Sequence, residues 1–169
     1  MEQIAEQAVV STGSLYNYFP SKHALLLAVW SRRASAALAT VEERIGSVDS
    51  AAEKCAELLL IFAEVVGTFE TPVTREVLAS ALSSPHLELE GYIAIDMALL
   101  ARLEALVAEL RYSGQIAAEV SPRPAAALLY GAVMMQVMAG VAAPHHFDME
   151  RARTAIATQV DLAFRGLTA

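Results

Sequence analysis

The sequence predicts an all-α protein, with an N-terminal helix-turn-helix head joined by a long helix to a larger helical body. Of the 169 residues, 56% are hydrophobic and 18% are charged. Long runs rich in Ala, Leu and Glu show apolar residues at helical spacing. Prolines and glycines lie at the junctions between these runs. We place the head and its connecting helix at residues 1–45 and the body at residues 46–169.

The first two helices are predicted to be short and to meet at a tight turn. Ile4, Ala5 and Ala8 share one helical face, and the small alanines allow a second helix to pack closely. The first helix should end near Ala8. Ser11 is a favoured N-cap, so a second helix should begin at about Thr12.

The second helix is predicted to have an apolar face and a polar face. Its apolar face is expected to consist of Leu15, Tyr18 and Phe19, and its outer face of Thr12, Gly13, Ser14, Tyr16 and Asn17. Pro20 should end this helix by moving the preceding residue out of the α region. Ser21 should then cap a third helix that begins at Lys22.

Residues 4–25, IAEQAVVSTGSLYNYFPSKHAL, resemble the DNA-binding signature of TetR-type transcriptional regulators. The matching residues are Ile4, Ala5, Glu6, Ala8, Val10, Ser11, Gly13, Ser14, Leu15, Tyr16, Tyr18, Phe19, Ser21, Lys22 and Leu25. The resemblance implies that Thr12, Gly13, Ser14, Tyr16 and Asn17 lie in the major groove, with Tyr18 and Lys22 near phosphates. Ser11 is also expected to be a DNA-binding residue. It also implies a homodimeric repressor that binds a near-palindromic double-stranded operator.

The chain departs from the family pattern at two points. Val9 stands where the family has a turn glycine, and a β-branched residue at positive φ is strained. Family members also begin with a further helix before this motif, so we expect the chain to be a shortened version of a longer protein. Without that helix, DNA affinity should be poor.

The charge distribution places the acidic excess away from the head. The net charge is −7, but residues 1–34 contain three basic and two acidic side chains. Steering toward DNA should therefore be weak, and local phosphate contacts should position the protein. The single cysteine, Cys55, and the lack of a basic segment followed by an apolar core at the start favour a cytoplasmic protein.

The body is predicted to contain a series of helices, the first being the connecting helix over residues 21–45. Its buried side should consist of Leu25, Val29, Ala36, Leu38, Val41 and Ile45. A central helix should start at Asp49 or Ser50 and run to residue 69, and a shorter helix should occupy residues 74–84. The next helix, residues 87–112, should turn inward Ile93, Met97, Leu100, Leu103 or Leu106, Val107 and Leu110.

Residues 125–143 form an uncharged run close to the length that spans a bilayer. The run is Ala-rich and lacks Trp or Lys at its ends, so we interpret it as a helix buried partly by this chain and partly by a second copy. A last amphipathic helix, residues 149–167, places Ile156, Val160 and Phe164 on one face. The region from Gly114 onward is similar to the TetR-type C-terminal region, which implies a dimeric four-helix bundle and no membrane partner.

The chemistry of the chain favours binding over catalysis. No phosphate loop, nucleophile elbow or metal-ligand spacing occurs, so we predict no enzyme activity, cofactor or metal site. Thioether and aromatic side chains could line a pocket for a small hydrophobic ligand, and the candidates are Phe62, Phe69, Tyr92, Met97, Tyr130, Met134 and Met138. Two alternatives remain open: a helical small-molecule carrier or sensor without DNA binding, and a helical enzyme acting on a hydrophobic substrate.

Overall fold

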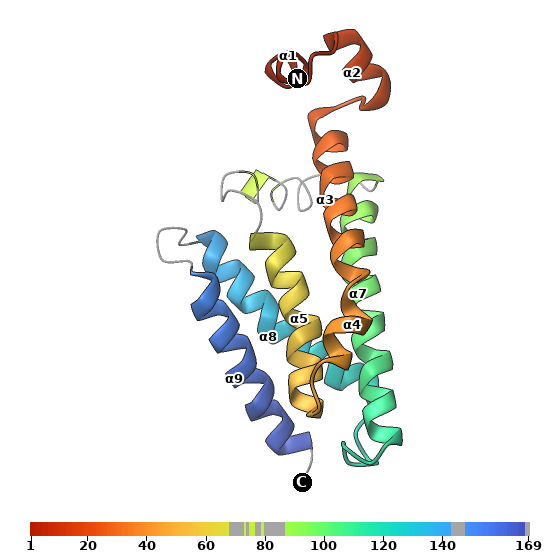
Figure 1. Cartoon of the computed structure of the whole chain (residues 1–169), viewed down its shortest axis with the longest axis vertical. Helices are drawn as coiled ribbons and strands as arrows, with labels where there is room; N and C mark the ends of the chain where they lie inside the picture. Colours follow the sequence, from red (N-terminus) through yellow and green to blue (C-terminus); the bar gives the residue numbers. More distant parts are fainter. Residues whose placement is uncertain (68–72, 74, 77–78, 80–86, 143–147, 168–169) are drawn as a thin grey trace.

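Every element in the described part of the chain is a helix, as the sequence predicts. The computed structural model describes residues 1–67, 73, 75–76, 79, 87–142 and 148–167. The helices are α1 (Glu2–Gln7), α2 (Thr12–Tyr18), α3 (Lys22–Leu38), α4 (Val41–Gly46), α5 (Ala51–Gly67), α7 (Leu87–Tyr112), α8 (Pro122–Ala142) and α9 (Met149–Leu167). Figure 1 shows α1 and α2 as a small head at one end of α3, with the remaining helices packed below it.

The head has the boundaries that its capping residues predict. The Ser11 side chain accepts a hydrogen bond from the backbone N–H of Ser14, and α2 begins at the next residue. The Ser21 side chain likewise accepts from the N–H of Ala24, at 3.0 Å, and starts α3. The predicted helix-turn-helix is confirmed.

The predicted connecting helix over residues 21–45 is wrong as one continuous helix. It is broken at Ala39 and Thr40 into α3 and α4. The Thr40 hydroxyl donates to the carbonyl of Ala37 at 2.7 Å, and the Thr40 N–H donates to the same carbonyl at 3.0 Å. A short polar side chain thus competes for backbone groups that would continue the helix. The break turns Val41 and Ile45 into the core.

The predicted buried face of this segment is also partly wrong. Val29 is 37% exposed and Ala36 is exposed, whereas Trp30 and Ala34 are buried at 6% and 4% exposure. The predicted face assumes one continuous helix over residues 21–45. Because the helix ends at Leu38, its buried stripe is free to follow Trp30 and Ala34 instead.

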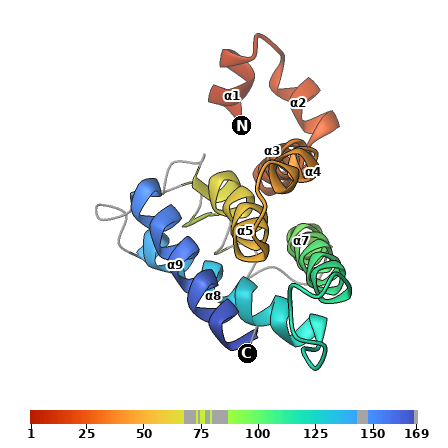
Figure 2. The ribbon, with the colours of Figure 1, turned by 60° about the horizontal axis from the view of Figure 1, so that its bottom comes forward.

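Helix α5 is the centre of the body, as its apolar sequence predicts. Eleven of its residues are buried, from Ala51 to Val66. A reciprocal capping box starts it: the Glu53 N–H donates to the Ser50 hydroxyl, and the Ser50 N–H donates to the Glu53 carboxylate. Helices α3, α4, α7, α8 and α9 all contact α5. Figure 2 shows these helices arranged around it.

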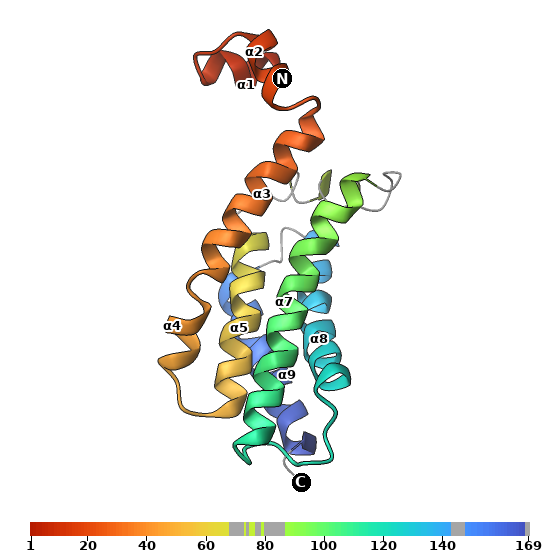
Figure 3. The same cartoon turned by 90° about the vertical axis from the view of Figure 1, so that its right-hand side faces the viewer.

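Helices α7, α8 and α9 complete the body. Leu103, Leu106, Val107 and Leu110 of α7 are buried as predicted, and so are Ile156, Val160 and Phe164 of α9. Met97 was predicted to point inward, but it is 49% exposed; the inward position in that turn belongs to Leu99. The side chain of Ile93 and most of residues 74–84 lie outside the described residues. Figure 3 shows α7 running beside α3 and α5 toward the head.

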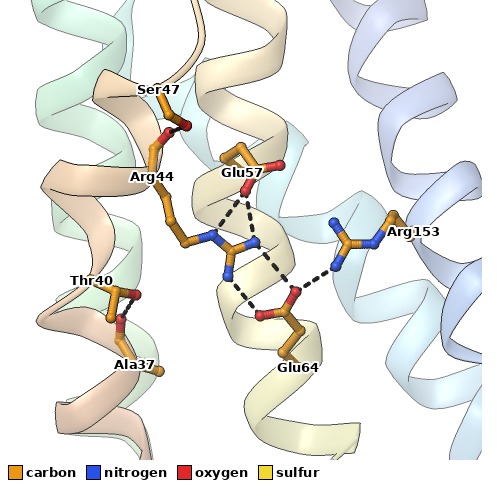
Figure 4. Close-up of polar contacts among 7 residues, drawn as sticks. All are labelled: Ala37, Thr40, Arg44, Ser47, Glu57, Glu64 and Arg153. Carbon is orange, nitrogen blue, oxygen red and sulfur yellow. Dashed lines mark hydrogen bonds and ion pairs between the residues drawn. The ribbon is translucent and has the colours of Figure 1, made fainter.

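A chain of charged side chains links α4, α5 and α9 (Figure 4). Arg44 donates to the carboxylates of Glu57, at 2.7 Å, and Glu64, at 2.6 Å. Arg153 donates to the other oxygen of Glu64 at 2.7 Å. The hydrogen bond that Arg44 donates to Glu64 is the main cause of the raised pKa of Arg44. These ionic hydrogen bonds fix the position of α4 against the central helix.

One helical stretch of the described chain is long and apolar enough to cross a membrane, by length and composition alone. It is Lys22–Gly46, whereas the sequence singles out residues 125–143 and interprets them as a buried helix. The stretch is interrupted at Thr40 and supplies Trp30, Val41 and Ile45 to the core.

Candidate DNA-binding head and ligand site

The residues predicted to contact DNA lie together on α2 and its flanking residues. Tyr16 is 48% exposed and Tyr18 is 80% exposed. Ser11, Gly13, Ser14, Asn17 and Lys22 are also exposed, and Thr12 is half-buried. Leu15, at 8% exposure, anchors the opposite face of α2. Tyr18 was also predicted to be on the apolar face, which is wrong because its side chain lies in solvent.

The first turn of α2 leaves room for an external partner to approach the helix closely. Ser11 and Ser14 join their hydroxyls at 2.8 Å, so both are oriented by the cap. A Cβ built on Gly13 would meet only the Ser11 Oγ, at 3.9 Å. Within the protein itself Gly13 is therefore not required by packing. Its missing side chain opens the surface of the helix to an external partner.

The turn before α2 is a Schellman motif with valine in the glycine position. The Val9 N–H donates to the Glu6 carbonyl, and the Val10 N–H donates to the Ala5 carbonyl at 3.0 Å. Val9 has a φ of 56°, and it is the one non-glycine residue with positive φ in the described chain. The predicted strain at Val9 is confirmed. Its side chain is 91% exposed, so no packing compensates.

Lys22 is paired with an acidic side chain of the body. Its Nζ lies 2.9 Å from each carboxylate oxygen of Glu76. The Lys22 side chain is 50% exposed and the Glu76 side chain is 39% exposed. The ion pair is therefore weak, because water screens its charges. A DNA phosphate that approached Lys22 would compete with Glu76 for the same ammonium group.

Two of the predicted pocket residues, Phe62 and Tyr130, contact each other, and Phe62 lines a small apolar cavity. The rings of Phe62 and Tyr130 lie 5.8 Å apart between centroids, at 54°. Phe62 also lines a cavity of about 10 Å³, together with Ala34, Leu38, Ile61, Val65 and Leu99. The lining residues come from α3, α5 and α7. Met134, one turn after Tyr130, is partly buried against the same core.

The comparisons with known proteins agree with the geometry of the head. Residues 1–29 match the model described as "Bacterial regulatory proteins, tetR family". Its helix-turn-helix segment is therefore similar to that of the tetR-family regulators. No curated protein matches the chain.

Solved structures of TetR-family and related regulators share the fold. The transcriptional regulator FadR from Bacillus subtilis, in complex with stearoyl-CoA, has a TM-score of 0.78 and 20% identity over 98% of this chain and 87% of its own. The fatty acid degradation regulator FadR from Bacillus halodurans has a TM-score of 0.75 and 18% identity, over 98% and 87%. The TetR-family transcriptional regulator PfmR from Thermus thermophilus has a TM-score of 0.65 and 21% identity, over 97% and 86%.

The other predicted pocket residues are not brought to the cavity. Met97 and Met138 are exposed by 49% and 39%. Phe69 and the side chain of Tyr92 lie outside the described residues. A larger hollow of about 310 Å³ lies at the end of the body away from the head. It is lined by Glu42, Ile45, Gly46, Lys54, Leu106, Glu109, Leu110, Ser113 and Gln115, and by none of the predicted residues.

Sequence reasoning missed Asp96 on α7, which lies close enough to Tyr130 on α8 for each to influence the pKa of the other. Burial raises the pKa of Asp96, and the hydrogen bond from Tyr130 opposes this rise. Burial and the nearby Asp96 also raise the pKa of Tyr130. The available signal was a single acid inside the apolar run of residues 92–101.

Other reactive groups of the described chain are not placed for chemistry. Cys55 is fully buried in the core, and burial raises the pKa of its thiol to about 12. Within the described ranges, no group of three or more His, Cys, Asp or Glu is placed to hold a metal ion. His145 and His146 lie outside those ranges.

Proposed function

We propose that the protein is a cytoplasmic, ligand-responsive transcriptional repressor that binds a near-palindromic operator as a homodimer. The observation that carries this proposal is the exposed polar face of α2, which is capped at Ser11 and lies within the segment that matches the TetR family. The fold of the body, shared with solved regulators, supports the same class of function.

In this proposal α2 is the recognition helix of each head. Thr12, Gly13, Ser14, Tyr16 and Asn17 face the major groove, while Ser11, Tyr18 and Lys22 lie toward the backbone. Lys22 exchanges Glu76 for a phosphate when DNA binds. The two heads of a dimer would contact half-sites roughly 34–36 Å apart, about one turn of DNA.

Dimerisation is proposed to use α8 and α9. One face of α8 packs on this chain through Ala126, Leu129 and Val133. Its other face exposes large apolar side chains, with Leu128 at 61% and Met135 at 65%, and Leu162 of α9 is 58% exposed. Apolar side chains at this exposure on neighbouring helices fit a second copy of the chain.

The proposed ligand site is the cavity beside Phe62. The cavity touches Ala34 and Leu38 of α3, the helix that carries the head. A ligand that widened the cavity would move α3 and so change the spacing of the two heads. It would release DNA only if it binds the widened state more tightly than the closed one. The similar FadR structure from Bacillus subtilis contains stearoyl-CoA, which supports an apolar ligand.

The test is a fluorescence-anisotropy titration against DNA taken from directly upstream of the gene, at two salt concentrations. We expect binding that resists competitor DNA and weakens with salt. Tyr16→Ala and Lys22→Ala should each lower the affinity by about tenfold while the fold is kept. Tyr112→Ala and Lys54→Ala are the matched controls, because both residues lie at the end of the body away from the head.

Unchanged affinity in both head variants would reject the recognition face. If no DNA is bound, a selection from random sequences decides between a different operator and the absence of DNA binding. Recovery of a specific sequence would retain the regulator, and failure to enrich any sequence would overturn it.

A further inference from the structure

The hollow of about 310 Å³ lies at the end of the body away from the head, where α4, the start of α5 and the end of α7 meet. Figure 3 shows the first turn of α5 and the last turn of α7 at this end. The volume is in the range of small-molecule sites. The hollow shares no lining residue with the cavity beside Phe62, so it is a second and separate candidate site.

The lining of the hollow combines an apolar floor with a charged rim. Ile45, Leu106 and Leu110 are buried in the core, so the floor that they form is held in place by packing. Glu42 and Glu109 have exposed side chains and belong to the rim. A ligand in this hollow would therefore cover an apolar surface while its polar groups stay near water.

The opposite charges of the rim do not pair with each other. Lys54, in the first turn of α5, is half-buried and also lines the hollow. Its ammonium group forms no ion pair or hydrogen bond with any residue that the structure describes, and this includes Glu42 and Glu109. A cation and two carboxylates thus border one space without reaching each other across it.

The two carboxylates differ in how far their charge is neutralised. Arg102 donates to both oxygens of Glu42, at 2.8 and 3.2 Å. The same guanidinium reaches Glu109 through a single contact of 3.4 Å, so Glu109 is the acid with more capacity to bind a further cation. The Gln115 side-chain N–H donates to the Ser113 hydroxyl at 3.0 Å, which leaves the Gln115 carbonyl oxygen as an acceptor on the same wall.

We propose that the hollow binds a small zwitterion with an apolar body, of the class of an apolar α-amino acid. The ligand carboxylate pairs with Lys54 and the ligand ammonium group pairs with Glu109. The apolar body covers the floor formed by Ile45, Leu106 and Leu110. The helix dipoles favour the same orientation, since the hollow lies between the positive end of α5 and the negative end of α7.

The test compares three probes with similar branched apolar chains. L-leucine carries both charged groups, 4-methylpentanoate lacks the ammonium group, and 3-methylbutylamine lacks the carboxylate. Binding to the full chain is measured by isothermal titration calorimetry. We expect L-leucine to bind at least about tenfold more tightly than either analogue, because each analogue loses one charged hydrogen bond. Bound L-leucine should also raise the Tm, since it binds the folded state.

Two variants assign the two ends of the ligand. Lys54→Met should remove the advantage of L-leucine over 3-methylbutylamine and keep its advantage over 4-methylpentanoate. Glu109→Gln should do the reverse. Both substitutions keep the length of the side chain, so the Tm without ligand should stay close to that of the parent. Arg151→Met and Glu150→Gln are the matched controls, because they remove the same charges at exposed positions at the start of α9, away from the hollow.

The outcomes decide the inference independently of DNA binding. It would be overturned if L-leucine did not bind at up to roughly 10 mM, or if either analogue bound as tightly as L-leucine. An advantage that survived the variant designed to remove it would overturn it as well. None of these results would affect the proposed regulator, because the hollow includes no residue of the head. The expected crossed pattern would support the site whether or not the chain binds DNA.

Discussion

The strained residue in the head is Val9, whose backbone has a φ of 56° in a Schellman turn. The same motif ends α7, where Gly114 has a φ of 77° and the Gln115 N–H donates to the Leu110 carbonyl at 2.9 Å. The two turns have the same hydrogen bonds and differ in the residue at the left-handed position. Glycine has no Cβ to clash there, so the comparison isolates the strain at Val9.

We expect Val9→Gly to stabilise the head by about 1 kcal/mol, because it relieves the backbone strain and removes a side chain that contacts little. Hydrogen exchange at the Val10 amide, whose bond to Ala5 closes the turn, measures this directly. Val10→Gly is the matched control, since Val10 does not have positive φ. Slower exchange in the Val10→Gly protein, or faster exchange in the Val9→Gly protein, would contradict the strain argument.

Gly13 provides a second test at single-residue scale. A methyl group at this position meets only the Ser11 hydroxyl, at 3.9 Å, so Gly13→Ala should leave the fold intact and slightly favour the helix. On DNA, the same methyl group would occupy the space of the approaching backbone or base. We expect a loss of operator affinity of about tenfold or more with an unchanged or higher Tm. Full affinity in this variant would mean that the first turn of α2 does not touch DNA.

At the scale of elements, α4 depends on its ionic contacts more than on helix propensity. It has six residues, too few to be stable alone, and Arg44 ties it to Glu57 and Glu64 of α5. Glu64 also accepts from Arg153 of α9, so it joins three helices. We expect Glu64→Gln to lower the free energy of unfolding in urea by about 1–2 kcal/mol, a range reduced for the partial exposure of these side chains.

Asp161→Asn is the control for this prediction. It removes an acidic partner from Arg165 in an exposed i,i+4 pair at 2.7 Å, which is worth less than about 0.5 kcal/mol. A loss of stability in Asp161→Asn as large as that in Glu64→Gln would show that the ion pairs of this protein contribute alike, regardless of burial.

The elements that the sequence predicted well are those with local signals. Ser11, Ser21 and Ser50 cap helices where expected, and the helix that ends the body spans Met149–Leu167 as predicted. The break at Thr40 was missed because it depends on one side chain bonding to the Ala37 carbonyl inside an otherwise helical run. The inward position of Leu99 was missed for a related reason: α7 is apolar on many sides, so periodicity alone could not choose between neighbouring faces.

The candidate sites also differ in how well local sequence signals predict them. The residues proposed to bind DNA lie close together in sequence, so most of their common face follows from one short helix. The cavity is built from three helices that are far apart in the chain, and its lining residues Ala34, Ile61 and Leu99 carry no chemical signal of their own. Asp96 was distinguishable from its neighbours, but its partner Tyr130 lies on another helix. These groups are brought together by tertiary packing. The sequence pattern does not specify that packing.

At the scale of the whole molecule, the proposed operator binding requires two heads, so this proposal depends on assembly. The head is separated from α8 and α9 by the length of α3 and the body, as Figure 1 shows. A dimer formed through α8 and α9 would therefore set the distance between two heads from the far side of the molecule. Any change that loosens this contact should weaken operator binding even though no residue at the DNA is altered.

We expect the protein to be a dimer at micromolar concentration and Leu128→Glu to be a monomer. Leu128 is 61% exposed in the single chain, so replacing it should leave the protomer folded. In the proposed dimer each copy would bury this side chain, and two buried leucines contribute roughly 3–6 kcal/mol, so the variant should dissociate about 100-fold more readily or worse. Sedimentation velocity measures the change, and Tyr112→Glu, at a residue 96% exposed on α7, is the control.

Operator affinity should fall together with dimerisation, because each monomer retains one half-site contact and loses the second. A parent protein that sediments as a monomer would reject the α8–α9 interface, whereas a monomeric Leu128→Glu protein that still binds the operator fully would reject the need for two heads.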